Sequence, residues 1–185
     1  ELLSYAVGCM FGRYSLDKEG LILANQGETV EDYYNKIKEE GIEQSAIKFN
    51  PDEANIIPVL DEDWFTDDIV GQFRTFLKVS FGEEHFDENV QFIEEAIGKD
   101  IRKYFLKDFY KEHVQRYKKR PIYWLFSSPK GSFNALIYMH RYNPDTVSVI
   151  LNNYLRTYKD KLSSERVRQK GITQSSTTSS SHKTK

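Results

Sequence analysis

Residues 121–140 read PIYWLFSSPKGSFNALIYMH, and this stretch decides the fold class. Two short runs rich in β-branched and aromatic residues, 122–126 and 132–139, flank the turn sequence SSPKG at 127–131, and this is the pattern of two paired strands. A type I turn prefers Pro at its second position and Gly at its fourth, as this turn has them. We therefore predict a β-hairpin over about 121–140 with the cation Lys130 at its tip.

Apolar residues recur at helical spacing on both sides of this hairpin. The pattern predicts helices over 2–11, 29–40, 61–80, 87–97, 100–117 and from 144 to about 162. Brief apolar runs between Gly, Asn, Pro and Asp residues favour two possible short strands, near 21–24 and 55–60. The predicted fold class is therefore α+β and mainly α-helical.

The composition is that of a folded domain rather than a disordered or membrane-spanning chain. Of the 185 residues, 39% are hydrophobic and 14% aromatic, which is enough to bury a core. A single cysteine, Cys9, excludes an internal disulfide and a thiolate zinc site. No run approaches the roughly eighteen apolar residues of a membrane helix, and the apolar start at 2–11 lacks the basic leader of a signal peptide. We expect a cytoplasmic protein and, because the sequence starts at Glu1 without Met, a fragment of a longer chain.

The charge is divided unequally along the chain. Residues 1–100 hold 8 Lys+Arg against 23 Asp+Glu, whereas residues 101–185 hold 18 against 5. Such asymmetry indicates that the basic half meets a polyanion, that the halves attract each other, or that both are simply solvated. We divide the chain accordingly into an acidic helical portion with short strands (1–98), a portion with the basic helix, the hairpin and the C-terminal helix (99–162), and a polar Ser/Thr-rich tail or linker (163–185).

No set of residues in the sequence assembles a catalytic site. The carboxylates at 61–63, 67 and 68 could hold Mg²⁺, but carboxylates in a first helical turn more often interact with the helix dipole. The four histidines lack the close spacing of metal ligands, and the sequence contains no glycine-rich phosphate loop. We therefore predict no catalytic residue, metal site or cofactor site within these residues.

Cations and hydroxyl groups gather around the predicted hairpin. Lys, Arg and Ser side chains are the usual contacts of DNA phosphates, and a two-stranded ribbon fits the major groove. Our hypothesis is that seven residues contact DNA: Lys118, Lys119, Arg120, Ser127, Ser128, Lys130 and Arg141. The cations of the helix over 100–117 would add long-range attraction. The alternative, in which these charges are only solvated, stays open.

Three stretches are long enough to carry a family likeness: SYAVGCMFGRYSLD at 4–17, WFTDDIVGQFRTFL at 64–77, and RPIYWLFSSPKGSFNALIYMHRYNPDTVSVILNNYL at 120–155. They closely resemble the BREX-type PglX family of large bacterial adenine-specific DNA methyltransferases, which act in phage defence and are related to type IIG restriction-modification enzymes. The resemblance covers most of residues 2–162.

The resemblance implies a part of such an enzyme that lies outside its reactive centre. In the family, a Rossmann-like domain binds S-adenosylmethionine through a Gly-rich loop and holds the extruded adenine at an Asn-Pro-Pro-Tyr motif. This sequence has neither, because 50–52 and 143–145 both read Asn-Pro-Asp. The implied segment is non-catalytic, inactive alone and downstream of the catalytic core, in or near the target-recognition region. Its implied partners are double-stranded DNA and the parent's methyltransferase domain, and S-adenosylmethionine is a cofactor of the parent.

Two hypotheses remain for the role of this segment. In the first, the basic helix and the hairpin contact the DNA backbone. In the second, the segment is a scaffold whose acidic and basic halves pack together or against the methyltransferase domain, without touching DNA. They differ in where the lysines at 107, 111, 118, 119 and 130 lie, because a scaffold would pair them with carboxylates of residues 61–95 and a DNA interface would leave them open. A free-standing nuclease or hydrolase is disfavoured, since no catalytic set can be named.

Overall fold

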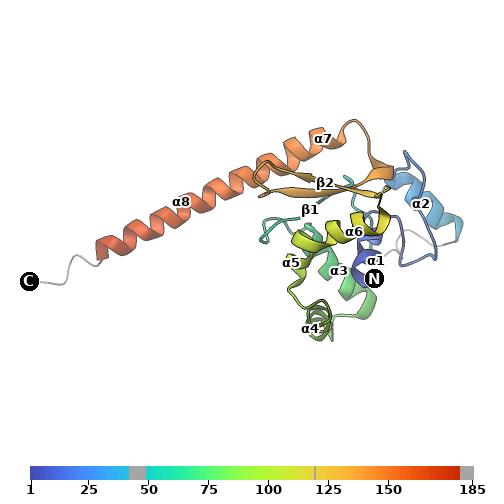
Figure 1. Cartoon of the computed structure of the whole chain (residues 1–185), viewed down its shortest axis with the longest axis horizontal. Helices are drawn as coiled ribbons and strands as arrows, with labels where there is room; N and C mark the ends of the chain where they lie inside the picture. The colour runs from blue at the N-terminus through green and yellow to red at the C-terminus, as the bar shows by residue number, and fades with distance from the viewer. Residues whose placement is uncertain (42–48, 119, 180–185) are drawn as a thin grey trace, which may run out of the picture.

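The computed structural model describes residues 1–41, 49–118 and 120–179. Helices form most of this part of the chain and surround a small sheet (Figure 1). In this view the helices of residues 69–117 lie below the sheet, and the long helical stretch of residues 146–179 starts above it and runs down to the left, past the end of the hairpin. This architecture confirms the predicted fold class, α+β and mainly α-helical. No helix within the described ranges is long and apolar enough to cross a membrane.

The sheet is antiparallel and has three strands, β1 (Ile56–Pro58), β2 (Tyr123–Ser127) and β3 (Asn134–Tyr138). Strand β3 lies in the centre, between β1 and β2. Strands β2 and β3 form the predicted hairpin, in which Tyr123 is opposite Tyr138. The strand predicted near 55–60 is confirmed as β1.

The strand predicted near 21–24 is wrong, because this segment is a loop. The N–H groups of Ile22 and Leu23 donate to the carbonyl oxygens of Arg13 and Gly12, which follow helix α1 (Leu2–Met10). Both side chains are buried. The apolar run therefore closes a loop against the end of α1 and does not join the sheet.

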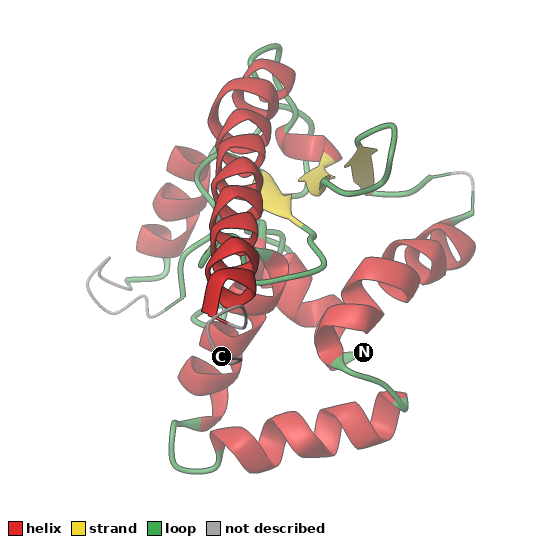
Figure 2. Cartoon of the chain, turned by 90° about the vertical axis from the view of Figure 1, so that its left-hand side faces the viewer, coloured by secondary structure: helices red, strands yellow, loops and turns green. Residues whose placement is uncertain are grey.

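The next three helices are α2 (Val30–Glu39), α3 (Ile69–Phe81) and α4 (Phe86–Ile97). Helix α3 was expected to begin near residue 61, but its N-cap is Asp68, whose carboxylate accepts a hydrogen bond from the N–H of Gly71 at 2.8 Å. The carboxylates before Asp68 therefore lie in a loop and not in a first helical turn. Figure 2 shows α4 at the lower edge of the body, far from α7, as does Figure 1.

The basic helix is interrupted by a π-helical segment. It consists of α5 (Ile101–Tyr104), the π-helical η2 (Phe105–Phe109) and α6 (Tyr110–Tyr117), joined through residues with helical dihedral angles. A wider π turn keeps residues four apart on one face. The buried row is consequently Ile101, Phe105, Phe109 and His113, whereas the neighbouring Val114 is only partly buried.

The last helix is longer than its apolar pattern indicates. After the short 3₁₀ turn η3 (Met139–Arg141), α7 (Thr146–Val149) and the π-helical η4 (Ile150–Leu155) lead into α8 (Arg156–Ser179). Helix α8 therefore continues from the apolar face that ends near Leu162 into the region that we assigned to a polar tail, and residues 180–185 of that tail lie outside the described ranges. Figure 1 shows α8 projecting from the body.

Both faces of the sheet are covered by apolar side chains. The larger cluster contains Ile57 and Leu136 and extends through α1 and α3 to the basic helix. The smaller cluster contains Ile56 and Ile137, the strand neighbours of the first pair, and includes Tyr158 of α8. Because successive side chains of a strand point to opposite faces, the basic helix and α8 pack on opposite faces of the sheet.

Candidate nucleic-acid interface

The hairpin separates the predicted DNA-contacting residues into two groups. Ser127, Ser128 and Lys130 lie at its closed end, whereas Lys118, Arg120 and Arg141 flank its open end. The four steps along β2 from Tyr123 to Ser127 span roughly 13 Å. These residues therefore do not form a single patch.

At the closed end, the two serines take part in the hydrogen bonds of the turn. The Ser127 hydroxyl donates to Oδ1 of Asn134 at 2.7 Å, and Oγ of Ser128 accepts from the N–H of Phe133 at 3.1 Å. Oγ of Ser128 also lies 3.5 Å from Oγ of Ser132, a contact in which either hydroxyl can be the donor. Lys130 is exposed at the tip, beside these hydroxyls.

At the open end, Arg141 has a structural role. Its side chain is buried, with 6% of the residue exposed. The guanidinium donates to the carbonyl oxygens of Phe11 and Glu53, both at 3.1 Å. Arg141 thereby joins the end of α1 to the loop before β1 and points away from the surface. Lys118 and Arg120 are exposed, and Lys119 lies outside the described residues.

A row of cations runs along the outer side of the basic helix. Lys103, Lys107 and Lys111 follow one another at intervals of four residues, as the buried row does, and all three are exposed. Two carboxylates nearby are already engaged, because Asp108 pairs with Lys99 and Glu112 accepts a hydrogen bond from the Tyr104 hydroxyl at 2.7 Å. Among the described residues, no ion pair involves this lysine row, Lys118 or Lys130.

Arg102 is the exception, because it joins the basic helix to the acidic loop before α3. Its guanidinium pairs with Asp63 and with Asp68, the latter at 2.6 Å, and donates to the carbonyl oxygen of Leu60 at 3.0 Å. The side chains of Arg102 and Asp68 are 13% and 1% exposed. Two of the carboxylates considered for Mg²⁺ therefore bind a guanidinium, and the described residues include no group of three or more side chains suited to a metal ion.

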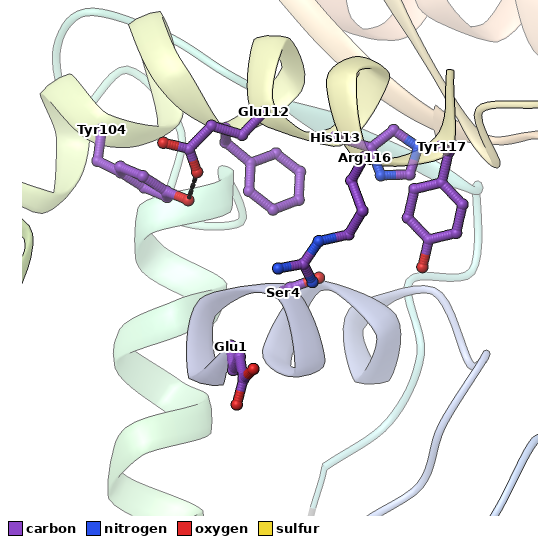
Figure 3. A pocket seen from close by; sticks show the side chains of 8 residues that line it. Glu1, Ser4, Tyr104, Glu112, His113, Arg116 and Tyr117 are labelled. Carbon is purple, nitrogen blue, oxygen red and sulfur yellow. Dashed lines mark hydrogen bonds between the residues drawn. The ribbon is translucent and has the colours of Figure 1, made fainter. Parts of the chain in front are cut away.

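A small cavity of about 70 Å³ lies where α6 meets the start of α1 (Figure 3). Arg116 extends from α6 towards Ser4, and Glu112 faces Tyr104. His113 borders the cavity, and its Nε2 accepts a hydrogen bond from the N–H of Ile122 at 3.1 Å. Burial, with the nearby Arg13 and Arg116, lowers the pKa of His113 to about 4. A neutral imidazole that receives a backbone N–H holds the hairpin in place, so this histidine is a structural residue.

The chain is homologous to a segment of adenine-specific methyltransferases, which confirms the resemblance seen in the sequence. It is 42% identical over 170 residues to the adenine-specific methyltransferase BrxX of Escherichia coli O9:H4 strain HS. It is 38% identical over 169 residues to the adenine-specific methyltransferase PglX of Lacticaseibacillus casei strain Zhang.

The matched region is a small part of each relative. The alignments cover 84% and 85% of this chain but only 14% and 13% of the two relatives. No family model matches the chain.

Proposed function

We propose that this chain is a non-catalytic, DNA-contacting segment of an adenine-specific (N6) DNA methyltransferase of a phage-defence or restriction-modification system, associated with target recognition in the bacterial cytoplasm. The observation that carries the proposal is the open lysine row Lys103, Lys107 and Lys111, continued by Lys118. The relatives, both adenine-specific methyltransferases, support the class of enzyme. The parent protein would bind S-adenosylmethionine elsewhere, as the Gly-rich loop and the adenine-binding motif are absent from this sequence.

A methyltransferase that acts on adenine in a duplex must hold the DNA backbone while the target base leaves the stack, and such a segment could provide these contacts. The target base must leave the stack before it can react, which costs a few kcal/mol of unstacking and unpairing energy. Contacts to the flanking backbone hold the duplex in register during this step. Lysines near phosphates also release condensed counterions, and this release provides affinity that does not depend on sequence. The row on the basic helix fits this role because no carboxylate within the described residues neutralises it.

The scaffold hypothesis is supported by a single cation. Arg102 joins the halves through Asp63 and Asp68, as a scaffold requires. The lysines at 107, 111, 118 and 130 are exposed and have no carboxylate partner in the described part of the chain, as a DNA interface requires. The two roles therefore divide between different faces of the basic helix, and DNA contact remains the function that the exposed face supports best.

The direct test is a titration of the 185-residue chain with duplex DNA at several salt concentrations. We expect the logarithm of the binding constant to fall linearly with the logarithm of the salt concentration, with a slope of about −0.9 for each phosphate contacted. Binding that is absent at low salt, or that does not change with salt, would refute DNA contact and favour the scaffold hypothesis.

The lysine row is tested by reversing one of its charges. Lys107→Glu should weaken duplex binding about tenfold at low salt, because it removes one phosphate contact and adds repulsion. The control is Lys38→Glu, the same change at an exposed lysine on α2. Equal weakening by both variants would show that only the net charge matters, and would contradict a specific role for the row.

A further inference from the structure

Helix α8 is anchored beside the hairpin tip by aromatic side chains. The ring of Tyr158 lies 5.5 Å from that of Phe133, the residue before β3, and 5.7 Å from that of Trp64. Lys161 donates to the carbonyl oxygen of Trp64 at 2.6 Å, and its ammonium lies 4.5 Å from the Phe65 ring centre. These contacts set the position of α8 relative to the tip with Ser127, Ser128 and Lys130, and Figure 1 shows the hairpin ending next to α8.

One strip of α8 carries cations that the body of the protein leaves exposed. At 3.6 residues per turn, Arg156, Lys159, Ser163 and Arg166 fall within about 80° of the helix circumference. All four are exposed. The neighbouring strip, with Tyr158 and Leu162, faces the smaller apolar cluster. The cationic strip therefore lies along the border between α8 and the body.

Carboxylates lie near only one end of this strip, where Arg166 lines a cavity together with Asp61, Glu62 and Asp63 without an ion pair among the described residues. Glu165 pairs with Arg168 at 2.8 Å on another side of the helix. Among the described residues, the Arg156 guanidinium donates only to the amide oxygen of Asn152, at 3.4 Å. Lys159 and Arg166 take part in no ion pair within the described part of the chain. The strip thus presents three positive charges and a hydroxyl.

We propose that the α8 strip and the hairpin tip form a second surface that binds the sugar-phosphate backbone of a nucleic-acid duplex. This inference rests on the proposed DNA-contacting function and adds to it a surface separate from the lysine row. The rise from Arg156 to Arg166 is about 15 Å, over which one DNA strand presents about four phosphates. The tip adds Lys130 and the Ser128 hydroxyl. Because α8 and the basic helix pack on opposite faces of the sheet, each surface neutralises phosphates of its own.

The test neutralises the strip in the 185-residue chain and measures duplex binding against salt. Lys159→Gln with Arg166→Gln should make the salt slope shallower by about 1.8, because two phosphate contacts are lost. The matched control compares two single variants, Arg166→Gln and Arg168→Gln, because Arg168 carries the same charge two residues away but on the side of α8 that is turned away from the strip. We expect Arg168→Gln to keep the slope of the unmodified chain, and thermal unfolding followed by circular dichroism to show that all variants are folded.

The outcomes separate this inference from the proposed function. If the unmodified chain shows no salt-dependent DNA binding, the proposed function fails, and the inference fails with it. If Lys107→Glu weakens binding while Lys159→Gln with Arg166→Gln leaves the affinity and slope unchanged, only the α8 surface is refuted. Equal effects of Arg166→Gln and Arg168→Gln would also refute it, because charge alone would then explain binding.

Discussion

The cations before and after residue 100 meet different surroundings. Of the seven described cations in the first hundred residues, five have a carboxylate within ion-pair distance: Lys18, Lys36, Arg74, Lys78 and Lys99. After residue 100, only Arg102 and Arg168 do so among the described residues. Where carboxylates are in excess a cation is neutralised inside the molecule, and where they are scarce it stays available to an external polyanion. The comparison teaches that the balance of charge, more than the number of cations, predicts a binding surface.

The largest expected effect is on the free energy of unfolding, when the ion pair between Arg102 of the basic half and Asp68 of the acidic half is removed. Asp68→Ala removes the buried one of the two carboxylate partners of Arg102, and also the N-cap of α3. Loss of one member of a buried pair costs about 3–5 kcal/mol of unfolding free energy, and the lost cap adds about 1 kcal/mol. Urea unfolding measures the change. The control is Glu62→Ala, at an exposed carboxylate, which should change the free energy of unfolding by less than about 0.5 kcal/mol. A similar loss in both variants would contradict a stabilising ion pair between Arg102 and Asp68.

The second effect is a pH dependence from His113. Burial holds the pKa of this imidazole at about 4, below its ordinary value, so the folded state binds its proton less readily than the unfolded state. The stability from the neutral ring is complete above the ordinary pKa of about 6.5 and is lost as pH falls towards 4, by about 3 kcal/mol. Urea unfolding between pH 7 and pH 4 measures this loss. His113→Phe should reduce the pH dependence over that range, and an unchanged profile in the variant would assign it to other groups.

The smallest effect contrasts two arginines at the open end of the hairpin. Arg141→Met should lower the unfolding free energy by about 2 kcal/mol, because it leaves the carbonyl oxygens of Phe11 and Glu53 without their donor. Arg120→Met should change it by less than about 0.5 kcal/mol, because Arg120 is exposed. Duplex binding should be weakened more by Arg120→Met than by Arg141→Met. Similar stability losses in the two variants would remove the distinction between structural and available cations.

Much of the candidate interface could be predicted locally. The Pro and Gly of the turn and the β-rich runs beside it predicted the hairpin and its cationic tip, since turn chemistry depends on neighbouring residues. The inward rotation of His113 could not be read from a regular helical period, because the π segment changes the number of residues per turn. The α8 strip was missed since the apolar face ends at Leu162, although Arg156, Lys159 and Arg166 already recur there at intervals of three and seven residues.

The sequence by itself determined the mainly helical α+β class, the hairpin, the opposite charge of the two halves and the similarity to adenine-specific methyltransferases. Each of these depends on composition, on neighbours within a few residues, or on the order of residues along the chain. Only the tertiary structure decided that Arg141 is buried, that the predicted contacts divide between the two ends of the hairpin, and that α8 lies beside its tip. Those outcomes depend on contacts between residues far apart in the chain, such as Arg141 with Phe11 and Tyr158 with Trp64, which local patterns do not contain.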